Sequence, residues 1–390
     1  MSSYEQTSLR ASIINLVKNL LGAGMLSLPL AIAICGDFRV GLALIVLCGI
    51  MNASTFILVG SCCRMTGERT YRGLFTSVFG QRRVWMIDLT IMLNSTFACL
   101  ALMILVGDFT SRCISGLLGY DVPRAVGIFV FGFGFILPLC LFDNLKSLRV
   151  TSGLGILATL YTFLFVLSQA LYRDSYIVTT ERSYGVLKSW ALFCTSFMAH
   201  YNAPRFYTEL HNPTLKRFTL LVLLSFSLVA VIYVFFAWAG FAVFGSSVKG
   251  DVLESFESSS AYLQLAWISM ALSLTFTYPF VFTALKDSFA QLVPHANLKV
   301  FIFSAISASI IIASCIDDVS GFNAIKGATS ACILSFIIPP AMYLRAVTDS
   351  RPLIDGNSSC IASMFIARLI LLIGCPLGIA SVLYLIVSNT

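Results

Sequence analysis

One short stretch of the sequence combines residues that interrupt a helix with a cation. The run VKNLLGAGMLSLPLA, residues 17–31, contains Gly22, Ala23 and Gly24, and Lys18 precedes them by one turn. Glycine weakens a helix by about 1 kcal/mol. An interrupted helix leaves N–H groups at the start of its second half and carbonyl groups at the end of its first half. Such a break could bind a zwitterion, the carboxylate at the N–H groups and the ammonium at the carbonyls.

A second stretch has the same character. The run SFMAHYNAPRFYTEL, residues 196–210, contains His200, Asn202 and Pro204. Proline in a helix interior costs about 3 kcal/mol, because it lacks the backbone donor and clashes with the preceding turn. We therefore expect a second helix break here, with polar side chains beside it.

The composition places both stretches in a membrane. The 390 residues are 58% hydrophobic and 11% charged, with a mean hydropathy of +0.90, whereas soluble domains carry about 25% charged residues. Apolar runs recur that are long enough to cross a hydrocarbon core of about 30 Å. They do not alternate apolar and polar residues, which argues against a barrel. The net charge of +7 lies in short loops, so we assign it to membrane topology and not to nucleic acid.

We predict an all-α polytopic protein with eleven transmembrane spans, at residues 11–36, 40–63, 84–108, 125–142, 151–171, 188–210, 218–244, 261–285, 299–316, 322–344 and 360–387. Residues 11–387 would form one transporter-like membrane domain, and residues 1–10 a short N-terminus. Fifteen loop lysines and arginines fall on one side and seven on the other. The positive-inside rule therefore places the N-terminus in the cytoplasm.

The two breaks fall in the first and sixth predicted spans. Irregular backbone at membrane depth is tolerated only where it is buried in protein or lines a cavity. Broken helices at corresponding positions of two halves are the signature of a five-plus-five inverted repeat, the LeuT-like fold, with its substrate between the breaks. Small residues alone would favour close helix packing. The second break, five spans later, favours a binding site.

Four segments resemble the amino acid/auxin permease family of the APC superfamily. NLVKNLLGAGMLSLPLAI is similar to the first helix of these neutral, proton-coupled and vacuolar amino acid transporters, and FMAHYNAPRFYTELHNPTLKRF to the sixth. LSLTFTYPFVFTALKDSF resembles the eighth helix and FIIPPAMYLRA the tenth. The resemblance covers nearly the whole chain and implies a membrane permease for amino acids, working as a symporter driven by H⁺ or Na⁺.

The resemblance also implies which residues form the site. Backbone groups of Gly22, Ala23, Gly24 and Met25 would bind the substrate carboxylate. Carbonyls near Asn19 and Leu20, together with those near Thr195 and Ser196, would face the ammonium, and His200 would complete the substrate site. Glu209 also matches the signature, and its place near the cytoplasmic end suggests a structural or gating role.

Lys18 bears on the coupling ion. Sodium-coupled members of the family carry an asparagine at this position and a threonine on span eight, for which Thr277 is the match. Proton-coupled members carry a lysine here. An ammonium at the sodium position would exclude Na⁺ and satisfy the same oxygens. Lys18 lies about 10 Å into the span, and an intramembrane cation is a functional hypothesis by default. Three interpretations stay open: a fixed surrogate cation, a titrating proton carrier, and a side chain that snorkels to the headgroups.

His200 is a second proton-carrier candidate, because its unperturbed pKa is near neutrality. The alternative is a neutral histidine that hydrogen-bonds freed backbone in the break. Lys326 and Arg368 also fall within spans, and we expect both to reach an interface without a specific role.

The leading function is secondary active transport of small neutral amino acids by alternating access, linked to H⁺ or independent of Na⁺. A Na⁺-coupled symporter and a transporter-like amino acid sensor are the alternatives. An enzyme is not expected, because paired intramembrane aspartates, GxSxG and HExxH are absent from the sequence. We expect no cofactor or metal; the partners are an amino acid, a proton or Na⁺, and the lipid bilayer. The location would be the plasma membrane or a vacuolar or lysosomal membrane.

Overall fold

The computed structural model describes residues 6–141, 149–172, 185–256, 260–316, 318–349 and 358–388, and its regular elements are all helices. Eight helices are long and apolar enough to cross a membrane, and a bent pair over residues 9–33 makes a ninth by the same measure. The predicted spans 188–210 and 299–316 coincide with a shorter broken pair and with a 17-residue apolar helix. The prediction of an all-α membrane protein is therefore confirmed for these ranges.

The helices follow the predicted spans in order. Span one is divided into α1 (Leu9–Leu20), a 3₁₀ turn (Ala23–Ser27) and α2 (Leu28–Ala33), and span six into α9 (Val186–Ser196), a 3₁₀ turn (His200–Asn202) and α10 (Ala203–Thr208). The other helices are α3 (Phe38–Thr66), α4 (Tyr71–Phe79), α5 (Val84–Leu118), α6 (Arg124–Phe131), α7 (Leu137–Leu141), α8 (Arg149–Tyr172), α11 (Leu215–Phe244), α12 (Ala261–Leu292), α13 (Leu298–Ser314), α14 (Val319–Lys326), α15 (Ile338–Asp349) and α16 (Ser358–Ser388).

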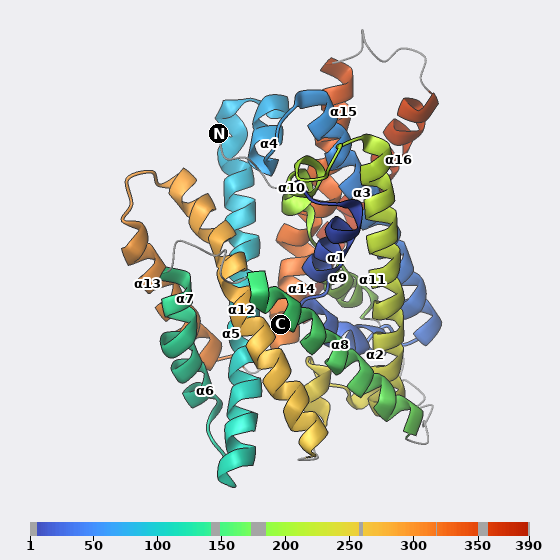
Figure 1. The fold of residues 1–390 in the computed structure, drawn as a ribbon. Coiled ribbons are helices and arrows are strands. Elements are labelled where there is room, and N and C mark those ends of the chain that lie inside the picture. The colour runs from blue at the N-terminus through green and yellow to red at the C-terminus, as the bar shows by residue number, and fades with distance from the viewer. Residues whose placement is uncertain are drawn as a thin grey trace.

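The helices pack in two groups. In one group α5 lies along α12, and α6 and α13 pack against α5. In the other group α11 packs against α1, α2 and α3, and α9 packs against α2 and α3. Figure 1 shows α6, α7 and α13 on one flank of the molecule and α3 and α11 on the opposite flank. Between the groups, α8 contacts both α11 and α12, and α14 contacts both α5 and α9.

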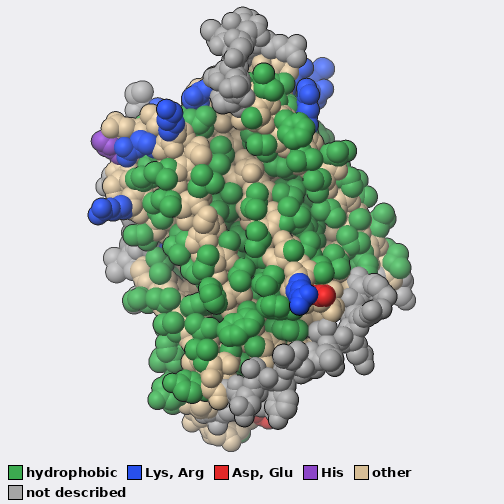
Figure 2. Space-filling model, turned by 90° about the vertical axis from the view of Figure 1, so that its right-hand side faces the viewer, with side chains coloured by type: hydrophobic (Ala, Val, Ile, Leu, Met, Phe, Trp, Pro, Cys, Tyr) green, Lys and Arg blue, Asp and Glu red, His purple; other side chains and the backbone are tan. Residues whose placement is uncertain are grey.

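The outer surface is apolar over most of its height. On α11, the side chains of Leu224, Leu228 and Val231 are 48%, 48% and 52% exposed. Figure 2 shows a broad belt of hydrophobic side chains, with most of the visible lysines and arginines gathered at one end. Soluble proteins rarely expose an apolar surface of this extent. We interpret the belt as the face that contacts lipid.

The segment between spans two and three forms the short helix α4, which packs against the helix bundle. The Tyr71 hydroxyl donates a hydrogen bond to the carbonyl of Leu334 at 2.9 Å. Arg72 Nε contacts both carboxylate oxygens of Asp88 on α5, each at 3.0 Å. The buried Leu74 and Phe75 complete the contact, so α4 is held against the helix bundle by both apolar and charged groups.

The segment before α1 is bound to the segment after α10. Thr7 and Leu210 form an isolated parallel bridge. The Thr7 N–H and hydroxyl both donate to the carbonyl of Glu209, at 2.7 and 3.1 Å, and the His211 N–H donates to the carbonyl of Thr7 at 2.9 Å. The start of span one and the end of span six are thus joined, at the end of the molecule that carries α4 (Figure 1).

Candidate functional site

The break in span one lies at the predicted glycines. The chain bends by 49° between α1 and the segment Ala23–Ala33. Gly22 has an extended backbone, with φ −125° and ψ −165°. In the part of the chain that the structure describes, the N–H groups of Gly22, Ala23 and Gly24 donate to no acceptor, whereas the Met25 N–H donates to the carbonyl of Gly22 at 3.1 Å. Three successive free N–H groups at the start of a helical segment form a site for an anion.

The break in span six lies directly against the break in span one. The Ser196 hydroxyl is 3.0 Å from the carbonyl oxygen of Gly24 and 3.0 Å from that of Leu192. A Cβ at position 24 would lie 3.0 Å from Ser196 Cα, closer than ordinary packing allows. Glycine at position 24 therefore permits the close approach of the two interrupted backbones.

Tyr233 on α11 joins the ends of α1 and α9. Its hydroxyl lies 2.6 Å from the carbonyl oxygen of Leu20 and 2.9 Å from that of Ser196, and its side chain is fully buried. Both carbonyls come from helix ends, where no intrahelical donor is available. The sequence drew no attention to this tyrosine, because it lies within an apolar span and its role depends on tertiary packing.

The other predicted carbonyls differ in their surroundings. The carbonyl of Asn19 receives no hydrogen bond from any described residue, and the Asn19 side chain accepts one from Asn202 at 3.4 Å. The carbonyl of Thr195 accepts from the Met198 N–H at 3.5 Å. The structure thus gathers Asn19, Leu20, Thr195 and Ser196 at the two breaks. Of their four main-chain carbonyls, that of Asn19 accepts no hydrogen bond from a described residue.

His200 points away from the span-one break. It is fully buried, with Nε2 2.8 Å from the Thr55 hydroxyl on α3 and Nδ1 3.0 Å from the Ser335 hydroxyl. The Thr55 hydroxyl proton is used within α3, because its oxygen lies 3.0 Å from the Met51 carbonyl. Nε2–H therefore donates to Thr55, and Nδ1 accepts from Ser335. A neutral imidazole satisfies every one of these bonds.

Lys18 is half-buried at the crossing of α8 and α12. Its Cε would lie 4.0 Å from a Cβ at Gly155, and the Ser273 hydroxyl donates to the carbonyl of Gly155 at 3.4 Å. Thr277 follows Ser273 by one turn and donates its hydroxyl to the Ser273 carbonyl at 2.8 Å. The structure brings Lys18 to the helix that carries Thr277, and the Lys18 ammonium has no ion-pair or hydrogen-bond partner among the described residues.

Span ten also reaches both breaks, which the sequence did not indicate. The Thr195 hydroxyl donates to the carbonyl of Asn323 at 2.6 Å, and Asn323 Nδ2 donates to the Ser27 hydroxyl at 3.4 Å. Two π-helical stretches, Gly327–Ala331 and Ile333–Ile337, follow directly. π-helical turns are frequent at functional sites. In the sequence, the only signal for this contact is that the predicted span 322–344 contains the polar residues Asn323 and Lys326.

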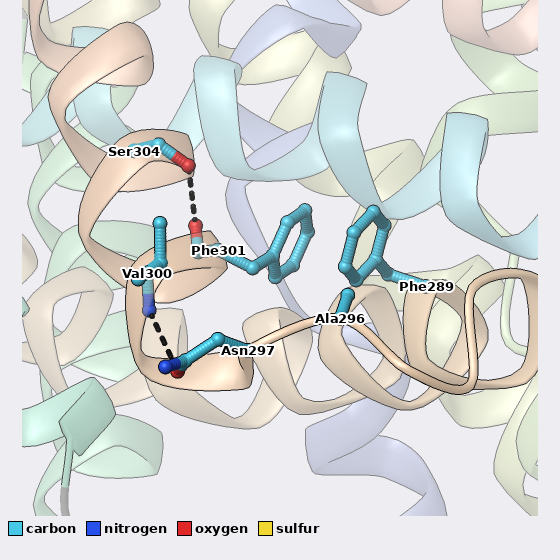
Figure 3. Close-up of a pocket in the computed structure, with 6 residues that line it drawn as sticks. All are labelled: Phe289, Ala296, Asn297, Val300, Phe301 and Ser304. Carbon is cyan, nitrogen blue, oxygen red and sulfur yellow. Dashed lines mark hydrogen bonds between the residues drawn. The ribbon is translucent and has the colours of Figure 1, made fainter.

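A separate surface groove lies between α12 and α13 (Figure 3). It has a volume of about 410 Å³ and is lined by Phe289, Ala296, Asn297, Val300, Phe301 and Ser304. The two phenylalanine rings stack with centroids 3.7 Å apart. None of its lining residues belongs to either break, so the groove is not part of the candidate site.

Comparison with known proteins identifies the family. Residues 5–387 match the family described as transmembrane amino acid transporter protein. The chain belongs to this family. The resemblance found in the sequence is thereby confirmed, and the family is one of transporters and not of enzymes.

Individual relatives are distant. Solute carrier family 38 member 10 of Mus musculus is 24% identical over 366 residues, which is 87% of this chain and 33% of that protein, so the chain spans about one third of its length. Putative sodium-coupled neutral amino acid transporter 11 of Mus musculus is 22% identical, with 96% of this chain and 86% of that protein covered. Vacuolar amino acid transporter 2 of Saccharomyces cerevisiae is 24% identical, with 89% and 78% covered.

Proposed function

We propose that the chain is a secondary active transporter that binds an amino acid between its two helix breaks and works by alternating access. The observation that carries the proposal is the row of free N–H groups at Gly22, Ala23 and Gly24, held against Ser196 of the second break. The α-carboxylate binds these N–H groups, and the α-ammonium binds the carbonyl of Asn19 and the second lone pairs of Leu20 and Ser196. Backbone groups thus recognise the part that all amino acids share.

The architecture we propose is eleven spans in a five-plus-five inverted repeat. The grouping of helices supports it: spans one, two, six and seven pack together, and spans three, four, eight and nine form the other group. Each group contains spans that are five positions apart, as two copies of one unit would. The lysines and arginines gathered at one end support a cytoplasmic N-terminus (Figure 2).

For the coupling ion, we propose that Lys18 takes the place of a bound sodium ion and that transport is linked to H⁺. The position of Lys18 supports this, because its Cε lies beside Gly155 of α8, which also contacts Ser273, and Ser273 is one turn from Thr277 on α12. A fixed ammonium there repels Na⁺ and supplies the positive charge that the surrounding oxygens would otherwise obtain from the ion. His200 is assigned a structural role, because both of its ring nitrogens are bound to other helices.

Sodium coupling is the second candidate, and the name of one relative favours it. The murine protein that is similar over 96% of this chain is described as putative sodium-coupled neutral amino acid transporter 11. A vacuolar relative in yeast supports an internal membrane as one of two locations, the plasma membrane being the other. The H⁺-linked and Na⁺-coupled transporters differ in the driving ion, so one uptake experiment separates them.

The test is uptake of labelled amino acids into proteoliposomes, with Na⁺ and pH gradients imposed separately. We expect uptake driven by an inward proton gradient and indifferent to Na⁺. Because the fixed ammonium is what excludes Na⁺, the variant Lys18→Asn should gain a response to Na⁺. The control is Lys249→Asn, which removes an exposed lysine from an outer loop.

Sodium-dependent uptake that ignores pH would refute the role of Lys18 and leave amino acid transport intact. Saturable binding of amino acids without any uptake would refute transport and favour a sensor. No binding and no uptake across the panel would refute the proposed function as a whole.

A further inference from the structure

Lys326 lies at the level of the two breaks, which its position in the sequence did not suggest. It is the last residue of α14, immediately before the first π-helical stretch. Three residues earlier, Asn323 is bound to Thr195 of span six and Ser27 of span one. Lys326 therefore follows by less than one turn a residue that contacts both breaks.

Two contacts with α5 define the direction in which Lys326 points. On the outer side, the rings of Phe322 and Phe97 lie with centroids 6.3 Å apart. On the inner side, the Ser330 hydroxyl donates to Asn94 Oδ1 at 3.4 Å. Lys326 follows Phe322 and precedes Ser330 by four residues each, so all three share one face of the helix. Its side chain therefore enters the seam between span ten and α5, between these two contacts.

The Lys326 cation has no counter-charge among the residues that the structure describes. No described carboxylate lies within ion-pair distance of Lys326, and its ammonium makes no hydrogen bond within the same ranges. The seam that holds Lys326 lies next to the span-six break, because Asn94 Nδ2 is 4.0 Å from the Met198 sulfur. Lys326 is half-buried.

An unpaired cation at membrane depth is costly, and such residues generally pair with a partner or face a pathway. The carboxylate site at Gly22–Gly24 supplies no partner, because its anion is already accounted for by the α-carboxylate. A second anion is needed to compensate Lys326. The chemistry that provides it in an amino acid is a side-chain carboxylate.

We propose that Lys326 binds the side-chain carboxylate of the substrate, so that the chain prefers acidic amino acids over their neutral amides. This inference rests on the proposed function and changes its expected substrate class from small neutral to dicarboxylic amino acids. A neutral substrate would bind the same backbone groups and leave Lys326 unpaired in a low-dielectric setting. Discrimination then comes from one cation, since glutamate and glutamine are nearly the same in shape.

The test compares uptake of labelled glutamate and glutamine, and of aspartate and asparagine, into proteoliposomes. We expect the acidic member of each pair to be preferred in kcat/KM by about 10- to 100-fold, the range of a charge-assisted contact. The variant Lys326→Met should remove most of this preference while amide uptake is retained or rises. Lys326→Arg should keep the preference, and Lys249→Met, a change at an exposed outer lysine, should leave it unchanged.

A second measurement covers a variant that fails to fold. Glutamate should raise the thermal stability of the purified wild-type protein more than glutamine does at equal concentration. Equal stabilisation, a wild-type preference for the amides, or an unchanged preference in Lys326→Met would overturn the inference and leave amino acid transport standing. Absence of uptake for all four compounds, and for a wider amino acid panel, would refute the proposed function instead.

Discussion

The hydroxyl of Tyr233 offers a sharp test of how the two breaks are held together. Tyr233→Phe removes one oxygen and keeps the ring, so no cavity forms around this fully buried side chain. The carbonyls of Leu20 and Ser196, at 2.6 and 2.9 Å from the hydroxyl, then lose their donor. Each belongs to a helix end and has no other donor among the described residues.

The expected decrease in the free energy of unfolding follows from the missing hydrogen-bond donor. A buried acceptor left without a partner costs about 1–3 kcal/mol. Because one hydroxyl proton serves one carbonyl at a time, we expect the cost of one acceptor, about 2 kcal/mol. For a chain of this size that corresponds to a fall in Tm of a few degrees. The same carbonyls flank the proposed ammonium position, so KM should rise more than kcat falls.

The assay is thermal unfolding of the purified protein in detergent, followed by uptake kinetics in proteoliposomes. The matched control is Tyr161→Phe, which removes a tyrosine hydroxyl that donates to the carbonyl of Tyr262 at 2.9 Å on the exposed surface. An exposed carbonyl recovers its bond from solvent, so this control should change Tm by less than about 1 °C. Equal Tm values for the two variants would refute the role given to Tyr233.

Two further predictions concern buried polar groups elsewhere. Burial raises the pKa of the Asp251 carboxyl, in the segment between α11 and α12, well above its ordinary value, and the neighbouring Glu254 acts in the same direction. The folded chain therefore keeps this proton to a higher pH than the unfolded chain, so stability is greatest below about pH 4 and falls as pH rises through the folded pKa. Asp251→Asn should flatten the dependence of Tm on pH and raise Tm near neutrality; parallel curves would contradict this. Ser335→Ala removes the donor to His200 Nδ1. This variant should lower the free energy of unfolding by about 1 kcal/mol and leave the pH profile of uptake unchanged. A displaced pH profile would show instead that His200 carries the transported proton.

Local features of this chain could be predicted from the sequence, and features of tertiary geometry could not. Gly22 and Gly24 marked the first break and Pro204 the second, because glycine and proline act on their own helix. The role of Tyr233 was not predicted, since it depends on which face of α11 meets the two breaks. In a membrane helix both the lipid face and the packed face are apolar, so periodicity does not reveal that rotation.

The direction of the Lys326 side chain could not be predicted for the same reason. Counting residues from a span end gives depth, and snorkelling then follows as the default for a lysine. Its direction toward α5 depends on the contact of Phe322 with Phe97 and the bond of Ser330 to Asn94. His200 was identified by its type and place in the break, whereas its partners Thr55 and Ser335 lie 145 and 135 residues away in the chain.

The bridge between Thr7 and the segment after α10 constrains how the molecule can move. Three hydrogen bonds join Thr7 to Glu209 and His211, and Thr7 stands two residues before the start of α1. In a transporter that exposes its site to each side in turn, α1 and α10 cannot tilt apart at this end while those bonds persist. Either α1 and α10 move together as one rigid body, or the substrate pathway toward that side of the membrane stays closed until the bridge is broken.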